Sequence, residues 1–270
     1  MEIQLLHRRN FVKIGLALSG LATLAQAENA QANNAVVVNR SARLRALSQR
    51  LVKFRAQQLL AIAPETSLDS VLAVEKLIKS HMLFLNSSVP TQARPLLSNL
   101  QATITTMFGA SNTAITKDSL IQVNTAAAEV LKNADALTVE MVAISKQKAI
   151  NLVNIAGRQR MLSQRMTKNY FLIANGIQTK ELPANIDADR KLFTDSLAAL
   201  GASPEADAKI AKGLADVAVL YKRFEPLVVD RTDAGLAKAN LVNLATLSEQ
   251  LLTAAHDATL LFEDAFTAKA

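Results

Sequence analysis

The 270-residue chain contains no cysteine, and it has only 8 glycines, 6 prolines and an aromatic content of 4%. Without cysteine there is no disulfide framework, no thiolate metal site and no cysteine nucleophile. Half of the residues are apolar and a fifth are charged, which is typical of a globular protein rather than a disordered or fibrous one. Because helix-breaking residues are scarce, this composition favours helices packed on helices. The formal net charge of +7 suggests an anionic partner, whose kind depends on where the charge lies.

Residues 1–27 have the organisation of a cleavable signal peptide. The basic segment Arg8-Arg9-Asn10-Phe11-Val12-Lys13 precedes an apolar run from Ile14 to Ala25, and small residues stand before a cleavage point near Ala27. The apolar run has about 12 residues, too few to cross a bilayer. The paired arginines resemble the twin-arginine signal for export of folded proteins, and an ordinary secretory signal is the alternative. We therefore expect a soluble periplasmic protein whose mature chain begins near Glu28.

Two segments of the chain repeat each other at an offset of 115 residues. Residues 39–53 read NRSARLRALSQRLVK and residues 154–168 read NIAGRQRMLSQRMTK, with eight of fifteen positions identical. Helix-breaking residues recur at nearly the same offset, with Pro64 against the stretch from Gly176 to Pro183 and Gly109 near Pro226. This agreement of motif and breakers predicts an internal duplication.

Apolar residues between the breakers recur with helical spacing, as at Leu68, Val71, Leu72 and Val74. Each repeat is predicted to form four helices, over 35–62, 67–87, 92–109 and 117–145 and again over 146–176, 186–200, 205–224 and 233–266. The predicted fold is therefore all-α, with two tandem four-helix bundles at 28–145 and 146–270. Because no glycine or proline lies between residues 110 and 156, the sequence leaves two arrangements open. The bundles either stack end to end on a continuous helix or lie side by side about a break near Ser145.

The positive charge is concentrated on the first helix of each repeat. Residues 29–64 contain six basic and no acidic side chains, and residues 141–180 contain seven basic and none acidic. The rest of the chain after residue 27 carries 14 basic and 22 acidic residues. Ion pairing between helices is one interpretation of this pattern, and a site for a small anion is the other. Arg158 and Arg165, which share one helix face, are predicted to form structural ion pairs.

Another face of the second cationic helix, around Arg160, favours an anion site. Small residues precede the arginine on that face and hydrogen-bonding residues follow it: Ala156, Gly157, Ser163, Gln164 and Thr167. Arginine stays charged and presents a planar fork of donors that matches a planar oxyanion. The same face of the first cationic helix carries Arg45 with Ser41, Ala42, Ser48, Gln49 and Val52.

The segment Asn154-Ile155-Ala156-Gly157-Arg158-Gln159-Arg160-Met161-Leu162-Ser163-Gln164-Arg165-Met166 resembles the signature helix of the type IV pili methyl-accepting chemotaxis transducer N-terminal (PilJ-like) domain. It is also similar to the periplasmic nitrate/nitrite sensor domains of bacterial histidine kinases. Those domains are four-helix bundles that bind nitrate or nitrite between two copies of this helix. The resemblance implies that Arg160 contacts the anion and that the Ala156-Gly157 pair lies against it. The candidate ligand-binding residues are Arg160, Gly157, Ala156, Asn154, Ser163, Gln164, Arg45, Ala42 and Asn39.

The first repeat departs from the motif, because Ala42 replaces the glycine and Ala46 stands where the second repeat has Met161. We therefore expect the first copy to have lost ligand contacts. The resembling sensors are membrane-anchored, whereas we expect no anchor here. The sequence thus predicts a sensor or binding protein for a small oxyanion, nitrate or nitrite by resemblance, that reports to a membrane-bound receptor or transporter. A periplasmic protein-interaction adaptor that no longer binds ligand is the alternative.

No pattern in the sequence indicates an enzyme. The histidines have no metal-ligand spacing, and no Ser-His-Asp order or phosphate loop appears, so we expect no catalytic residue, metal or cofactor. His256-Asp257 is interpreted as a surface pair. Nucleic-acid binding is not expected, because the arginines lie on helix faces that should pack within an exported protein. The identity of the anion stays open, as does the choice between a site within one chain and a site between the chains of a homodimer.

Overall fold

The computed structural model describes residues 34–147, 149–177, 179–233 and 235–267, and the secondary structure in these ranges is helical. A helix over 34–59, called here the first motif helix, is followed by α2 (Pro64–Ser88), the short 3-10 helix η1 (Thr91–Ala93), α3 (Arg94–Ser111), α4 (Lys117–Ser145), α5 (Ile150–Ala174), α6 (Glu181–Gly201), α7 (Ala208–Val229) and α8 (Lys238–Thr267). The predicted all-α class is confirmed. The predicted signal peptide, residues 1–27, lies outside the described residues.

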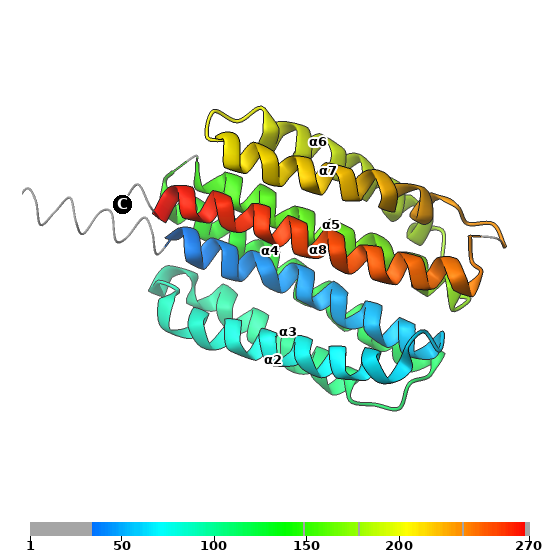
Figure 1. Ribbon diagram of the computed structural model, residues 1–270. Coiled ribbons are helices and arrows are strands. Elements are labelled where there is room, and N and C mark those ends of the chain that lie inside the picture. The colour runs from blue at the N-terminus through cyan, green and yellow to red at the C-terminus, as the bar shows by residue number, and fades with distance from the viewer. Residues whose placement is uncertain (1–33, 148, 178, 234, 268–270) are drawn as a thin grey trace, which may run out of the picture.

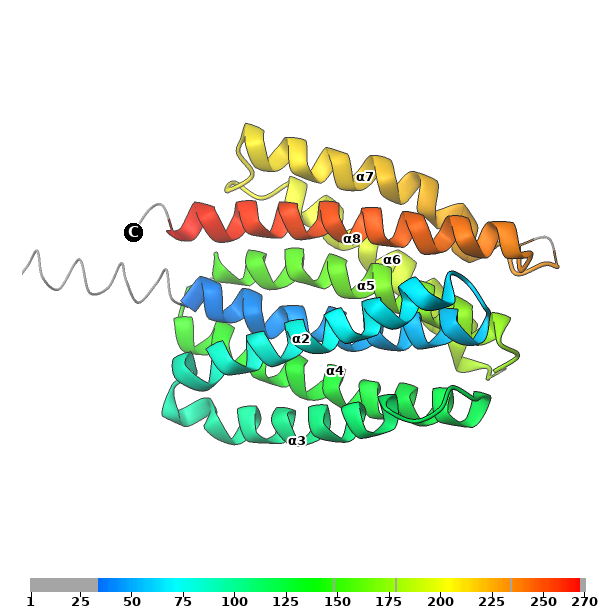
Figure 2. The same cartoon turned by 60° about the horizontal axis from the view of Figure 1, so that its bottom comes forward.

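The eight helices form two bundles that lie side by side (Figure 1). The first motif helix joins α2, α3 and α4, while α5 joins α6, α7 and α8. A second view shows the first motif helix and α5 running in the same direction near the middle of the molecule (Figure 2). The side-by-side arrangement follows from a break after Ser145, where Lys146 takes a left-handed conformation with φ 55° and ends α4. The chain then turns back into α5 instead of continuing as one rod.

Each bundle has a hydrophobic core to which the outer helices contribute one apolar face. On α7, for example, the buried residues Ile210, Leu214, Val217, Tyr221, Phe224 and Val228 recur every three or four positions and face α8 and α6. The first motif helix and α5 differ, because each stands between the rest of its own bundle and the other bundle. They are therefore buried on most sides although they carry many polar and charged residues. Those polar groups must find partners inside the protein.

Several predicted helix ends are wrong by a few residues. Helix α6 begins at Glu181 rather than 186, because Pro183 is accommodated in its first turn, where backbone N–H groups have no intrahelical acceptor. Gly109 lies within α3 and Pro226 lies within α7, so neither breaks its helix where the sequence suggested.

Equivalent helices of the two bundles are separated by two different numbers of residues in the sequence. The first motif helix and α5 correspond at 115 residues, as the repeated motif does. The last helices correspond at 121 residues: Gln49 Nε2 donates to the carbonyl of Ala127, and Gln164 Nε2 donates to the carbonyl of Ser248, 121 residues further on. The duplication itself stays a prediction, but this correspondence allows the two motif sites to be compared residue by residue.

Candidate functional site

The motif helices approach each other closely at Ala42 and Gly157. A Cβ placed on Gly157 would lie 3.3 Å from the Cβ of Ala42 and 2.9 Å from Nη2 of Arg160. Glycine at this position therefore leaves room both for the neighbouring helix and for the guanidinium group that folds back over its own helix.

Two reciprocal contacts between an arginine and an asparagine join the motif helices. Arg160 Nη2 donates to Asn39 Oδ1 at 2.7 Å, and Arg45 Nη2 donates to Asn154 Oδ1 at 2.9 Å. The two contacts are equivalent under the 115-residue offset, so the motif helices face each other within a single chain. Of the predicted site residues, Asn39, Ala42, Arg45, Asn154, Ala156, Gly157 and Arg160 are all buried or central in this interface.

The two arginines differ in their third partner. Both are almost fully buried, with Arg45 0% and Arg160 1% exposed. Arg45 Nη1 forms an ion pair with Asp135 Oδ1 of α4 at 2.5 Å, whereas Arg160 Nη1 lies 3.1 Å from Nδ1 of His256 on α8. Asp135 and His256 correspond at the 121-residue offset. Within the described residues, no carboxylate forms an ion pair with Arg160.

The pKa of the Arg160 guanidinium is lowered, in keeping with a buried cation that has no carboxylate beside it in the described part of the chain. Burial, followed by the nearby charges of Arg43 and Arg45, lowers its pKa to about 9, and Glu263 opposes this only in part. Burial also lowers the pKa of Arg45, but there the hydrogen bond and charge of Asp135 act in the opposite direction. Arg160 is thus a desolvated cation that forms no ion pair with any described acid.

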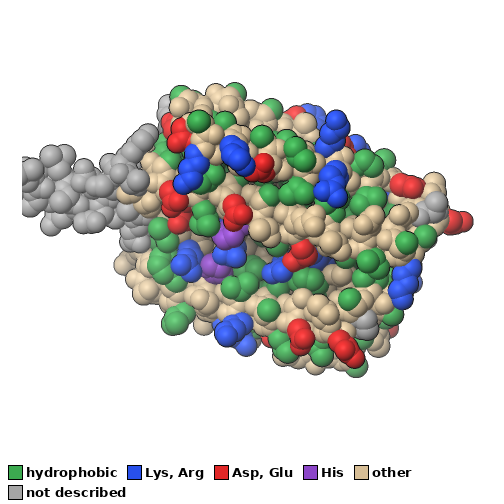
Figure 3. All heavy atoms as spheres, in the orientation of Figure 1, with side chains coloured by type: hydrophobic (Ala, Val, Ile, Leu, Met, Phe, Trp, Pro, Cys, Tyr) green, Lys and Arg blue, Asp and Glu red, His purple; other side chains and the backbone are tan. Residues whose placement is uncertain are grey.

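A pocket of about 220 Å³ opens beside Arg160, between the first motif helix, α5 and α8. Its lining combines cationic and apolar side chains with one acid: Arg43, Ala46, Leu47, Arg50, Arg160, Glu249, Leu252, Thr253 and His256. Histidine and basic side chains gather on this side of the molecule (Figure 3). Arg43 makes no hydrogen bond or ion pair with another described residue, and burial followed by the charges of Arg40 and Arg50 lowers its pKa. Arg45 does not line the pocket.

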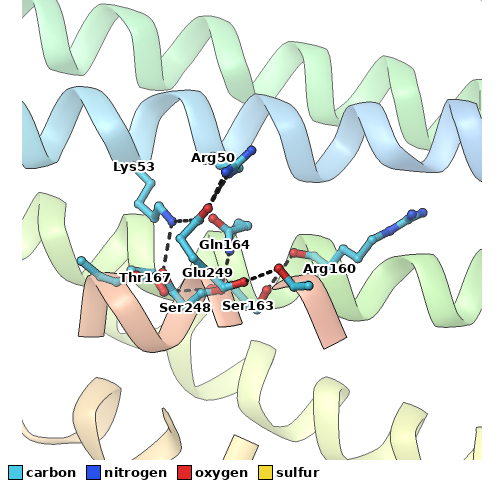
Figure 4. A network of polar contacts seen from close by, with 10 residues as sticks. Arg50, Lys53, Arg160, Ser163, Gln164, Thr167, Ser248 and Glu249 are labelled. Atoms are coloured by element: carbon cyan, nitrogen blue, oxygen red, sulfur yellow. Dashed lines mark hydrogen bonds and ion pairs between the residues drawn. The ribbon is translucent and has the colours of Figure 1, made fainter. Parts of the chain in front are cut away.

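The one acid of the lining already has partners. Arg50 and Lys53 of the first motif helix both bind Glu249, and Lys53 Nζ also donates to Ser248 Oγ at 3.1 Å (Figure 4). Although burial opposes ionisation, these two cations lower the pKa of Glu249 to about 2. The wall formed by Glu249 is therefore neutralised internally, and the remaining charge in the pocket is positive.

Two predicted site residues on α5 serve helix packing instead of lining the pocket. Gln164 Nε2 donates to the carbonyl of Ser248 at 3.0 Å, and Ser163 Oγ donates to the carbonyl of Arg160 at 2.9 Å (Figure 4). The predicted ion pair of Arg165 is confirmed, since Arg165 binds the buried carboxylate of Asp189. Arg158 has no ion-pair partner within the described ranges.

Ala46, which the sequence indicated as a lost ligand contact of the first motif, lies instead at the pocket beside Arg160. The correspondence of the two bundles places residue 46 of the first motif beside the arginine of the second. Ala46 lines the Arg160 pocket, whereas its larger counterpart Met161 is buried and does not line it. The short side chain therefore makes room at Arg160.

The histidines were the residues that sequence reasoning missed. His256 is not part of a surface pair, because it is half-buried against Arg160 while Asp257 is exposed. His81 on α2 is 3% exposed, and neither ring nitrogen has a hydrogen-bond partner in the described part of the chain. Burial, followed mainly by the charges of Arg43 and Arg40, lowers the pKa of His81 to about 3. The correspondence of His256 with Asp135 is not apparent at the 115-residue offset of the motifs, because the last helices correspond at 121 residues.

Residues 141–243 match the family model described as the type IV pili methyl-accepting chemotaxis transducer N-terminal domain. The matched range includes all of α5 with Gly157 and Arg160, and it ends before His256. Neither the curated proteins nor the solved structures contain a match to this chain. Among the described residues, none of the helices is long and apolar enough to span a membrane, and no cluster of three potential metal ligands occurs.

Proposed function

We propose that this protein is a periplasmic sensor or binding protein that holds one small anion in the Arg160 pocket. The single observation that carries the proposal is a buried guanidinium that borders a pocket and has no carboxylate partner among the residues that the structure describes. The partial match to a chemotaxis transducer domain supports a sensory role rather than a catalytic one.

The physical reason is the cost of an unpaired buried charge. A desolvated arginine is unfavourable unless an opposite charge compensates it, and an anion from solution can provide that charge. Arg160 offers a planar set of donors, and Arg43 adds a second cation in the same pocket. A planar oxyanion suits this geometry, and the resemblance of the motif favours nitrate or nitrite.

The walls of the pocket give binding a way to change the protein's shape. The first motif helix belongs to one bundle, while α5 and α8 belong to the other. An anion held between Arg43 and Arg160 draws the two bundles together, and it therefore stabilises their closed arrangement over any looser one. We propose that a membrane-bound receptor or transporter recognises this arrangement. Export through a twin-arginine signal is part of the same proposal.

Isothermal titration of the purified chain with nitrate, nitrite and acetate, in a buffer low in chloride, tests the proposal. We expect one binding site per chain for at least one of these anions and no detectable binding in Arg160→Ala. The matched control is Arg158→Ala on the same helix. The Arg158 side chain has no ion-pair partner in the described part of the chain and does not line the pocket, so this variant should bind normally. No heat with any of the three anions, or normal binding in Arg160→Ala, contradicts the proposal and favours an adaptor.

A further inference from the structure

We propose that the Arg160 pocket takes up its anion together with one proton, and that His256 receives this proton. The inference rests on the proposed function, because it concerns the same pocket. It adds that the affinity of the pocket for its anion depends on pH.

The contact between Arg160 and His256 fixes the protonation state of the imidazole. Arginine has only donors, so the 3.1 Å contact between Arg160 Nη1 and His256 Nδ1 requires a lone pair on Nδ1. The imidazole is therefore neutral, with its proton on Nε2. His256 acts as the hydrogen-bond acceptor at the position where the other bundle has the carboxylate of Asp135.

The groups that face His256 favour its neutral form. Arg160 faces it from α5, Arg43 from the first motif helix and His81 from α2. Burial, followed by the charges of Arg43 and Arg160, lowers the pKa of His256 to about 3. An imidazolium here would add a further positive charge to a pocket that already has an excess of them.

The two acids of α8 nearest the pocket relieve this excess only in part. Glu249 lines the pocket, but Arg50 and Lys53 already bind it. Glu263 accepts a hydrogen bond from Asn39 Nδ2 at 2.5 Å and makes no ion pair with His256 within the described residues. A new negative charge must therefore come from the ligand.

An anion in the pocket reverses the preference of the imidazole. When the anion accepts the hydrogen bond of Arg160 Nη1, Nδ1 of His256 loses its donor and its lone pair becomes free to bind a proton. The resulting N–H donates to the anion, and the imidazolium is stabilised by the charge beside it. The anion and the proton together leave the net charge of the site unchanged. Linkage then requires that acid strengthens anion binding and that the anion raises the pKa of His256.

Nitrate is the suitable probe, because it does not itself bind protons in the range that is tested. We expect its affinity to rise by at least about tenfold between pH 8.5 and pH 5.5, since one linked proton permits up to tenfold for each pH unit. Titrations at one acidic pH in two buffers with different heats of ionisation should show uptake of close to one proton per nitrate. This measurement uses the unaltered protein and does not depend on the folding of a variant.

Two matched variants assign the proton to a residue. His256→Gln keeps an acceptor for Arg160 but cannot titrate, so nitrate should bind more weakly and with an affinity that does not depend on pH. His81→Gln removes the other buried histidine near the pocket and should preserve the pH dependence. Affinity that is independent of pH without proton uptake in the unaltered protein overturns the inference, as does unchanged pH dependence in His256→Gln. Absence of nitrate binding at every pH counts instead against nitrate as the ligand of the proposed function.

Discussion

The Arg45 and Arg160 sites are two versions of one arrangement. In each, a buried arginine of one motif helix donates to an asparagine of the other, and its remaining Nη1 group meets the last helix of its own bundle. At Arg45 that helix supplies a carboxylate, and at Arg160 it supplies an imidazole. One site thus carries its own negative charge, while the other has a pocket and a cation with no ion-pair partner among the described residues.

The comparison teaches that two positions outside the motif's arginine distinguish the sites. The first is the pair of corresponding residues Asp135 and His256, which determines the counter-charge. The second is the pair of corresponding residues Ala46 and Met161: the short side chain of Ala46 lines the pocket beside Arg160, whereas Met161 is buried and does not line it. The arginine itself, which identifies the motif in the sequence, is common to both sites.

Replacing His256 with aspartate should make the Arg160 site resemble the Arg45 site, and we expect the largest effect from this change. In His256→Asp a carboxylate pairs with Arg160, so nitrate affinity should fall by about 100-fold or more, equivalent to about 2.7 kcal/mol. The free energy of unfolding should rise by about 2 kcal/mol, because a buried cation gains a charged hydrogen-bond partner. Titration calorimetry and urea unfolding measure the two effects. If His256→Asp keeps the nitrate affinity of the unaltered protein, the counter-charge does not distinguish the sites.

Removing the internal counter-charge of the other site is the reciprocal experiment. Asp135→Ala leaves Arg45 buried and unpaired, so we expect the free energy of unfolding to fall by about 2 kcal/mol, less than for a fully buried pair because the Asp135 side chain is 46% exposed. Urea unfolding measures the loss. Asp257→Ala, which removes an exposed carboxylate of α8, is the control and should change stability by less than about 0.5 kcal/mol. Equal stability of the two variants would show that Arg45 does not need Asp135.

A smaller effect is expected from the space-filling change Ala46→Met. Its longer side chain should occupy part of the pocket beside Arg160 and weaken nitrate binding by about tenfold, or about 1.4 kcal/mol. Because the added atoms enter an existing pocket, the midpoint of thermal unfolding should change little. Ala46→Ser, which adds few atoms, serves as the control and should bind nearly as well as the unaltered chain. Full nitrate affinity in Ala46→Met would place the anion elsewhere.

Much of the helical architecture could be predicted from the sequence, because the apolar period of each helix is regular and the breakers are few. The sequence left open the choice between a continuous helix and a break near Ser145, because the left-handed residue that makes the break is Lys146 rather than a glycine. In the site, the motif identified Arg160, Gly157 and Asn39, which do meet. Arg43 and His256 were missed because their roles depend on how the two bundles pack and on the shifted register of α8. Neither the packing of the bundles nor the register of α8 can be inferred from the residues next to Arg43 or His256 in the sequence.

The turn at Lys146 has a further consequence for the proposed anion site. Because it brings both motif helices together within one polypeptide, the halves of the pocket are present at a fixed effective concentration, and assembly of the pocket does not depend on how much protein the cell makes. In a symmetric site between two identical chains, every substitution would appear in both halves of the site. A tethered pair is free of that symmetry, so the Arg45 site can contain Asp135 while the Arg160 site contains His256.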